Sequence, residues 1–193
     1  MFRSNEIGVQ NSIDPSLLQY EGRNYLVWGS FRGIYVIELT ADGLSIMSGA
    51  KKKRIAGTAF EAVYIHKHGD YYYMFASIGS CCQGVKSTYK VVVGRSKKVW
   101  GPYKDKTGKP MLKNGYSLVI GANDHFVGNG HGSQIIQDDA GQDWLLYHGF
   151  SRSTPENGRI LLLDQIKWDQ EGWPYVEGGS PSYETQKAPV FNN

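Results

Sequence analysis

The 193-residue sequence has few cysteines and no long apolar run, and both shortages exclude whole classes of protein. Its only cysteines, Cys81 and Cys82, are adjacent, so they cannot link distant segments and lack the spaced pairs of a zinc site. No stretch approaches the roughly 18 apolar residues of a membrane span, and the first twenty residues lack the order of a signal peptide. We therefore expect a soluble chain with no membrane partner.

The charge is nearly balanced overall but unevenly placed. Net charge is only +3, yet 14 of the 21 cations lie between Lys51 and Lys113 with three acids, which gives this stretch 14 − 3 = +11. Such a basic stretch raises the alternative of a nucleic-acid-binding module. Basic runs such as Lys51-Lys-Lys-Arg54 at hairpin tips are usually solvated, however, so we expect no nucleic-acid partner.

Helical periodicity is almost absent, and the apolar residues fall in short runs instead. These runs are four to six residues long and are separated by turn sequences such as Glu21-Gly22 and Asn157-Gly158. With 24 glycines and 13 tyrosines, the pattern predicts an all-β chain of antiparallel hairpins. The strands are expected at Tyr25–Ser30, Ala62–Ile65, Tyr71–Phe75, Tyr89–Val93, Trp144–Tyr147 and Ile160–Leu163.

A repeated unit indicates how these hairpins are organised. First strands begin at Asp14, Glu61 and Ser133, each 11 residues before the aromatic residue that opens the second strand, and the spacings between units are 47 and 72 residues. A repeat of this length is typical of β-propeller blades. Because a propeller closes with about four to eight blades, three units make only part of a ring. We therefore expect sequence upstream of residue 1 to supply a missing blade.

Matched positions in the repeat carry groups suited to chemistry. Asp14 and Glu61 open the first strands of two units, and His131 lies just before the third. The inner strands of a propeller line one central channel, so these side chains are expected to converge. Burial in apolar surroundings keeps a carboxyl protonated, which suits Glu61 to a general acid.

A series of motifs in chain order strengthens this interpretation. They are Asn11-Ser-Ile-Asp-Pro15, Trp28-Gly-Ser-Phe31, Phe60-Glu-Ala62, Cys81-Cys-Gln-Gly84, Ser87-Thr-Tyr89, Val93-Gly-Arg-Ser96, Gly101-Pro-Tyr103, Gly130-His-Gly-Ser133, Gly172-Trp-Pro-Tyr175 and Gly179-Ser-Pro181. Together they resemble the five-bladed β-propellers of glycoside hydrolase family 43, and most closely its endo-1,5-α-L-arabinanase branch. The resemblance implies that residues 1–193 are the last three to four blades of a catalytic propeller.

The resemblance implies an inverting hydrolase that cleaves α-1,5-linked L-arabinan. Glu61 matches the general acid, and Asp14 matches the aspartate that modulates the pKa of that acid and orients it. The general base of the family lies in the first blade and is absent from this sequence. α-L-Arabinofuranosidase or β-xylosidase activity, or carbohydrate binding without turnover, remain alternatives.

The resemblance also implies binding residues. Asn11, Ser30, Phe31 and Arg32 match substrate contacts, and His131 matches the contact to a single, mostly water-coordinated calcium ion in the channel. No organic cofactor is expected, and the family suggests a secreted or periplasmic location. Two further expectations come from residue chemistry. Trp28 packs in the core, and Cys81 and Cys82 are expected as buried free thiols in preference to the alternative, a strained disulfide between adjacent residues.

Overall fold

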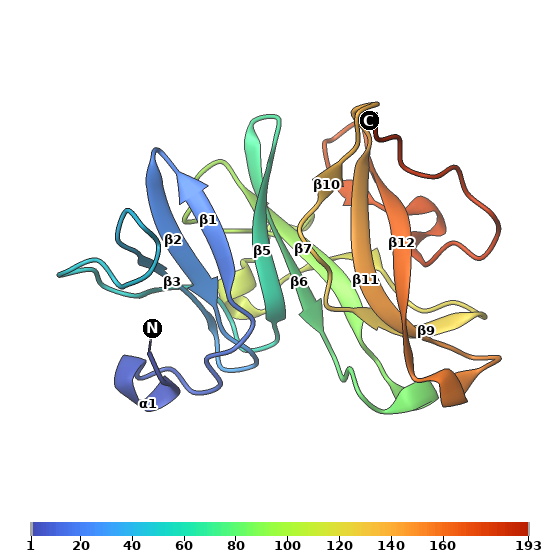
Figure 1. The fold of residues 1–193 in the computed structure, drawn as a ribbon, viewed down its shortest axis with the longest axis horizontal. Coiled ribbons are helices and arrows are strands. Elements are labelled where there is room, and N and C mark those ends of the chain that lie inside the picture. Colours follow the sequence, from blue (N-terminus) through green and yellow to red (C-terminus); the bar gives the residue numbers. More distant parts are fainter. Residues whose placement is uncertain (1, 193) are drawn as a thin grey trace. The chain divides into compact units, whose positions relative to one another are not determined.

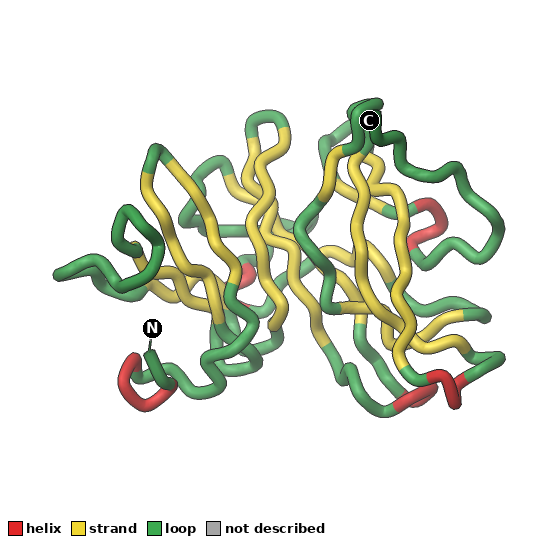
Figure 2. The backbone as a smooth tube through the Cα atoms, in the orientation of Figure 1, coloured by secondary structure: helices red, strands yellow, loops and turns green. Residues whose placement is uncertain are grey.

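The regular secondary structure is almost entirely β-strand, and loops and turns connect the strands (Figures 1 and 2). The structure is a computed structural model and describes residues 2–192. Within this range the only α-helix is the four-residue α1, Ser4–Ile7, and the other helical pieces are single 3-10 turns. No helix among the described residues is long and apolar enough to cross a membrane. The prediction of an all-β chain is confirmed.

The first sheet has the strand order β1-β2-β3-β4 and carries the first repeated unit. Its strands are β1, Ser16–Tyr20; β2, Arg23–Trp28; β3, Ile34–Glu38; and β4, Lys53–Ala56. The β1–β2 hairpin turns at Glu21 and Gly22, whose φ angles of 49° and 73° are those of a tight hairpin turn. This turn fixes the register that pairs Ser16 with Val27.

The second sheet has the strand order β5-β6-β7-β8 and begins with Glu61. Its strands are β5, Glu61–His68; β6, Tyr71–Ile78; β7, Lys90–Ser96; and β8, Ser117–Ile120. The 3-10 turns Gly84–Lys86 and Met111–Lys113 lie in the connections that flank β7. The second repeated unit therefore corresponds to the first two strands of this sheet.

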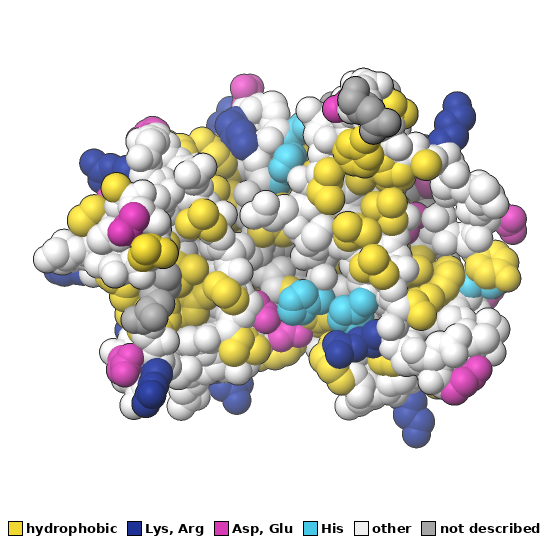
Figure 3. Space-filling view, viewed as in Figure 1, with side chains coloured by type: hydrophobic (Ala, Val, Ile, Leu, Met, Phe, Trp, Pro, Cys, Tyr) yellow, Lys and Arg dark blue, Asp and Glu magenta, His cyan; other side chains and the backbone are white. Residues whose placement is uncertain are grey.

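The third sheet has the strand order β10-β11-β12-β13, and β9 also pairs with β11. The strands are β9, Phe126–Gly130; β10, Ile136–Gln137; β11, Asp143–Ser151; β12, Arg159–Trp168; and β13, Pro174–Tyr175. The alternating Leu161 and Leu163 of β12 are 73% and 38% exposed, and apolar side chains gather over β10 to β12 on the face shown in Figure 3. This sheet thus leaves part of one face open.

The chain divides into two compact units. Residues 2–76 and 94–117 form the first unit, and residues 77–93 and 118–192 form the second. In the first unit Trp28, 1% exposed, packs in a cluster with Val9, Leu26, Ile37 and Leu39. The indole N–H of Trp28 donates to Ser12 Oγ at 3.2 Å. The prediction that Trp28 belongs to the core is confirmed.

The cysteine pair corrects the sequence prediction. Cys81 and Cys82 form a disulfide with each other, and Cys82 is exposed rather than buried. They lie in the loop between β6 and β7, where Ser80 and Thr88 close the loop by hydrogen bonds between their backbones and side chains. The Cα atoms of Cys81 and Cys82 are 3.8 Å apart, which is the ordinary spacing of adjacent residues. The expectation of buried free thiols is wrong.

Candidate active site

Glu61 opens β5 as a buried carboxylate within the first unit. It is 8% exposed, and its neighbours Phe60 and Val63 are 0% and 2% exposed. A buried carboxylate needs hydrogen-bond donors because it has left water. Ser30, which lies just after β2, supplies one: its hydroxyl donates to Glu61 Oε2 at 2.7 Å.

Asp14 is linked to the Glu61 segment by a hydrogen bond to its backbone. Its Oδ2 accepts a hydrogen bond of 3.1 Å from the N–H of Ala62, the residue that follows Glu61. Asp14 immediately precedes Pro15 and β1, and it is partly buried. The starts of β1 and β5 are also linked by Ser16 Oγ, which donates to the carbonyl of Val63 at 2.8 Å. The structure therefore brings the predicted acid and its predicted modulator to one junction of two strands.

Strained backbone gathers at the predicted site. Seven non-glycine residues among those described have positive φ, and five of them are predicted site residues or follow one directly. These five are Asn11 (55°), Asp14 (55°), Phe31 (49°), Ala62 (50°) and His131 (53°). Such conformations are costly for non-glycine residues and cluster at functional sites. This observation is independent of any motif and singles out the same positions.

The other predicted substrate contacts surround Ser30. The Asn11 side-chain amide donates to the carbonyl of Ser30 at 3.0 Å, and the N–H of Phe31 donates to the carbonyl of Phe60 at 2.9 Å. Phe31 is half-buried, whereas Arg32 is exposed and donates to the carbonyl of Phe31 at 3.0 Å. Phe31 therefore anchors the segment that carries Ser30 to the segment that carries Glu61, and Asn11 anchors the segment before Asp14 to Ser30.

Ser30 is buried against Glu61, a contact that the sequence did not indicate. The serine is only 1% exposed, and its hydroxyl is directed to Glu61. A hydrogen bond to one carboxyl oxygen restricts the rotation of the whole carboxyl group. In this structure Ser30 therefore positions the carboxyl group of Glu61.

Ser30→Ala is expected to lower the free energy of unfolding by about 1–3 kcal/mol, because Glu61 loses a buried hydroxyl donor. Denaturant unfolding of the 193-residue chain measures this difference. Ser45→Ala, at an exposed position, is the matched control and should change stability by less than about 0.5 kcal/mol. Equal losses in the two variants would show that the Ser30 hydroxyl contributes nothing to the site.

His131 belongs to the second unit, directly after β9. Its N–H donates to Ser77 Oγ at 2.8 Å, and its exposed ring lies 6.2 Å from the ring of His148. The preceding Gly130 packs on Tyr89 so closely that a Cβ there would lie 2.2 Å from the tyrosine ring. Only glycine fits at position 130, which explains the glycine directly before His131. Whether Asp14, Glu61 and His131 share one channel stays a prediction.

The groups around His131 bear on the expected calcium ion through their ligand chemistry. Calcium binds six to eight oxygen ligands, and imidazole nitrogen is a poor ligand for it. Within the described part of the second unit, the contacts established for His131 are the Ser77 hydroxyl and the His148 ring, neither of which is a carboxylate. These residues do not by themselves form a calcium site. The calcium ion stays a prediction.

The sequence did not reveal the backbone part of the site. The N–H of Ala62 binds Asp14, and the carbonyl oxygens of Ser30 and Phe60 hold the neighbouring segments together. Every residue carries these groups, so no residue type marks them. The one sequence signal at this position is Glu61-Ala62 at the start of a strand. It does not indicate the positive φ of Ala62.

Comparison with known proteins finds a family model that matches most of the chain. The profile of Glycosyl hydrolases family 43 matches residues 2–174. The extracellular exo-α-(1→5)-L-arabinofuranosidase ArbA of Cellvibrio japonicus is 40% identical over 183 residues, which cover 86% of this chain and 52% of the relative. The extracellular endo-α-(1→5)-L-arabinanase 1 of Bacillus subtilis is 35% identical over 181 residues, covering 90% and 53% respectively. The chain spans about half the length of these curated relatives.

Solved structures agree with this result. The α-L-arabinanase of Cellvibrio cellulosa in complex with arabinohexaose matches with a TM-score of 0.80 and 36% identity, covering 86% of this chain and 57% of that one. The endo-arabinanase of Bacillus licheniformis matches with a TM-score of 0.75 and 36% identity, again covering 86% and 57%. The expected fold class, the five-bladed β-propeller, is confirmed.

Proposed function

Because the chain belongs to glycoside hydrolase family 43, we propose that it carries the acid half of the catalytic site of a hydrolase that cleaves α-1,5-linked L-arabinan. The observation that carries the proposal is the junction at Glu61: a buried carboxyl held by Ser30, with Asp14 bound to the next backbone N–H. This junction lies in a chain whose relatives are named for exo- and endo-acting enzymes on arabinan.

In the proposed mechanism Glu61 is the general acid. Its proton passes to the glycosidic oxygen as the bond between that oxygen and the anomeric carbon breaks. A water molecule attacks the anomeric carbon from the opposite face, and its proton passes to a carboxylate base. A hydroxyl group ends on the anomeric carbon with inversion. Glu61 then regains a proton from solvent, and the base releases its proton to solvent.

Asp14 has a different role in this proposal. Its carboxylate binds the backbone directly after Glu61, so its negative charge stays near the acid. Asp14 thereby orients the Glu61 segment, and it is proposed as the residue that modulates the acid, as the family resemblance implies.

The general base is proposed to come from a blade that precedes this sequence and completes the ring. An inverting site separates its acid and base by about 6.5–9.5 Å, which leaves room for the attacking water. The relatives named extracellular also support a secreted or periplasmic location for the complete protein. Exo- or endo-action, and arabinofuranosidase or β-xylosidase specificity, are alternatives within the same proposed chemistry.

The proposal is tested with two proteins: the 193-residue chain, and this chain joined to the N-terminal part of the Cellvibrio japonicus relative. Each is assayed for release of reducing sugar from linear α-1,5-arabinan and for binding of arabino-oligosaccharides by calorimetry. We expect the joined protein to hydrolyse arabinan. If the joined protein folds and binds the sugar without hydrolysing it, the carbohydrate-binding alternative is correct. Absence of both binding and hydrolysis would reject the arabinan assignment.

A further inference from the structure

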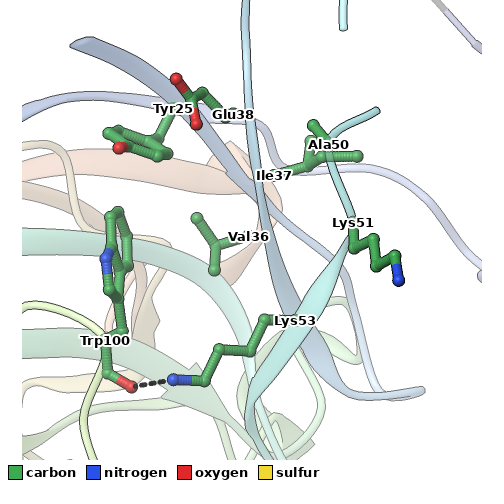
Figure 4. A pocket seen from close by; sticks show the side chains of 8 residues that line it. All are labelled: Tyr25, Val36, Ile37, Glu38, Ala50, Lys51, Lys53 and Trp100. Carbon is green, nitrogen blue, oxygen red and sulfur yellow. Dashed lines mark hydrogen bonds between the residues drawn. The ribbon is translucent and has the colours of Figure 1, made fainter. Parts of the chain in front are cut away.

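A cavity on the first unit lies apart from the Glu61 junction, and none of its lining residues belongs to the site described above. It holds about 190 Å³ and lies between Trp100 and the segment that contains Ala50 and Lys51 (Figure 4). Its lining residues come from β2, β3, β4 and two connecting segments: Tyr25, Val36, Ile37, Glu38, Ala50, Lys51, Lys53 and Trp100. All of them lie in the same compact unit.

One wall of this cavity is aromatic. The ring centroids of Tyr25 and Trp100 lie 4.6 Å apart. The Tyr20 ring also contacts Trp100, with 5.9 Å between the two centroids. Val36 and Ile37 add aliphatic surface to the same cavity. Flat aromatic and aliphatic surface of this size suits the apolar face of one ring of a ligand.

The polar groups of the cavity are separated by charge. Figure 4 shows Glu38 beside Tyr25 at one end, with Lys53 at the other end and Lys51 at the side. The Lys53 ammonium donates one hydrogen bond to the carbonyl of Trp100 at 3.3 Å, so two of its three N–H groups remain for a ligand. Glu38 Oε1 meets Arg23 at 3.4 Å, which leaves its second oxygen available. The cavity therefore offers donors to an anion at one end and an acceptor to hydroxyls at the other.

The positive charge continues into a second cavity. Trp100 and Lys53 also line a neighbouring cavity of about 380 Å³, together with Tyr20, Tyr72, Lys97 and Lys98. Both Lys97 and Lys98 are exposed. Two adjoining cavities with aromatic walls and repeated lysines fit a chain ligand that carries one anionic group per ring.

We propose that the Trp100 groove, defined as these two cavities, is an accessory binding site for an acidic polysaccharide whose sugar rings are uronates. The ring of one uronate would pack on Trp100 and Val36, its carboxylate would meet Lys51 or Lys53, and its hydroxyls would donate to Glu38. The next residue of the polymer would enter the second cavity and meet Lys97 or Lys98.

Other ligands match these features less well. Inorganic phosphate would leave the aromatic wall without a partner. A nucleic acid also carries one charge per residue, but its backbone oxygens are esterified, so it offers fewer free hydroxyls to the Glu38 carboxylate than a polyuronate does. A neutral glycan would leave the four lysines without anionic partners.

The test measures dissociation constants of the 193-residue chain for polygalacturonate, neutral linear arabinan and single-stranded RNA at about 150 mM salt, because exposed charge contacts are weakened by salt. We expect polygalacturonate to bind most tightly. Lys51→Gln with Lys53→Gln should raise its dissociation constant about tenfold or more, since charge-assisted contacts are lost. Lys109→Gln with Lys113→Gln removes equal charge from exposed positions outside the groove and should change it less than about twofold.

Trp100→Ala should weaken polygalacturonate binding to a similar extent. If this variant does not fold, the two double-lysine variants still test the proposal. Their four lysines are exposed, so the substitutions should leave the fold intact. The proposal is overturned if the unaltered chain does not bind polygalacturonate, if both lysine pairs weaken binding equally, or if RNA binds more tightly. These outcomes are independent of arabinan hydrolysis, so they do not depend on the proposed function.

Discussion

Glu61→Ala is expected to slow hydrolysis of linear α-1,5-arabinan by about 10²–10⁴-fold in the protein joined to the N-terminal part of the Cellvibrio japonicus relative. The physical reason is that an alkoxide leaves very slowly from a sugar unless a proton reaches its oxygen. Glu61 is the carboxyl group that the structure buries and fixes through Ser30 at this site. Initial rates of sugar release at saturating arabinan measure the effect.

Glu184→Ala provides the matched control for this variant. Glu184 is an exposed glutamate in the C-terminal segment, so its loss removes the same charge without touching the junction. Its rate should stay within about twofold of the unaltered protein. A Glu61→Ala protein that is folded and retains more than about a tenth of the rate would contradict the assignment of Glu61 as the acid.

Trp28→Ala is expected to lower the free energy of unfolding by about 3–5 kcal/mol, which approaches the whole stability of many domains. Trp28 is 1% exposed, packs against Phe2 and Tyr35, and lies two residues before Ser30. Its removal leaves a large cavity and frees the hydroxyl of Ser12 from the indole N–H. Denaturant unfolding monitored by circular dichroism gives the difference.

Two further variants serve as controls for the stability loss expected of Trp28→Ala. Trp28→Phe keeps most of the packed volume and should cost markedly less than Trp28→Ala. Leu44→Ala alters a side chain that is 72% exposed and should change stability by less than about 0.5 kcal/mol. If Trp28→Ala cost no more than Leu44→Ala, the core described for the first unit would be wrong.

The sequence predicted the hairpins of the fold well, because apolar runs and turn residues act locally. The run expected at Tyr71–Phe75 lies inside β6, and the run expected at Ile160–Leu163 lies inside β12. Strand β4 was missed because it begins with Lys53 and Arg54, which are exposed and give no apolar alternation. The strand expected at Ser133 is nearly absent, since β10 is only Ile136–Gln137.

The candidate site was predictable in its carboxyl groups but not in its contacts. Asp14 and Glu61 recur at matched offsets, so the repeat alone selects them. The hydrogen bond from Ser30 to Glu61 joins residues 31 positions apart, and no local pattern encodes it. The disulfide joins the adjacent Cys81 and Cys82, and residue types alone do not decide between such a bond and two free thiols.

The central claim is that Glu61 donates the proton to the leaving group, and its most direct test varies that leaving group. Glu61→Ala in the joined protein is assayed on linear α-1,5-arabinan and on an arabinofuranoside with an activated aryl leaving group, which needs no proton. We predict a loss of about 10²–10⁴-fold on arabinan and of less than about tenfold on the aryl substrate. Equal losses on the two substrates would contradict the claim.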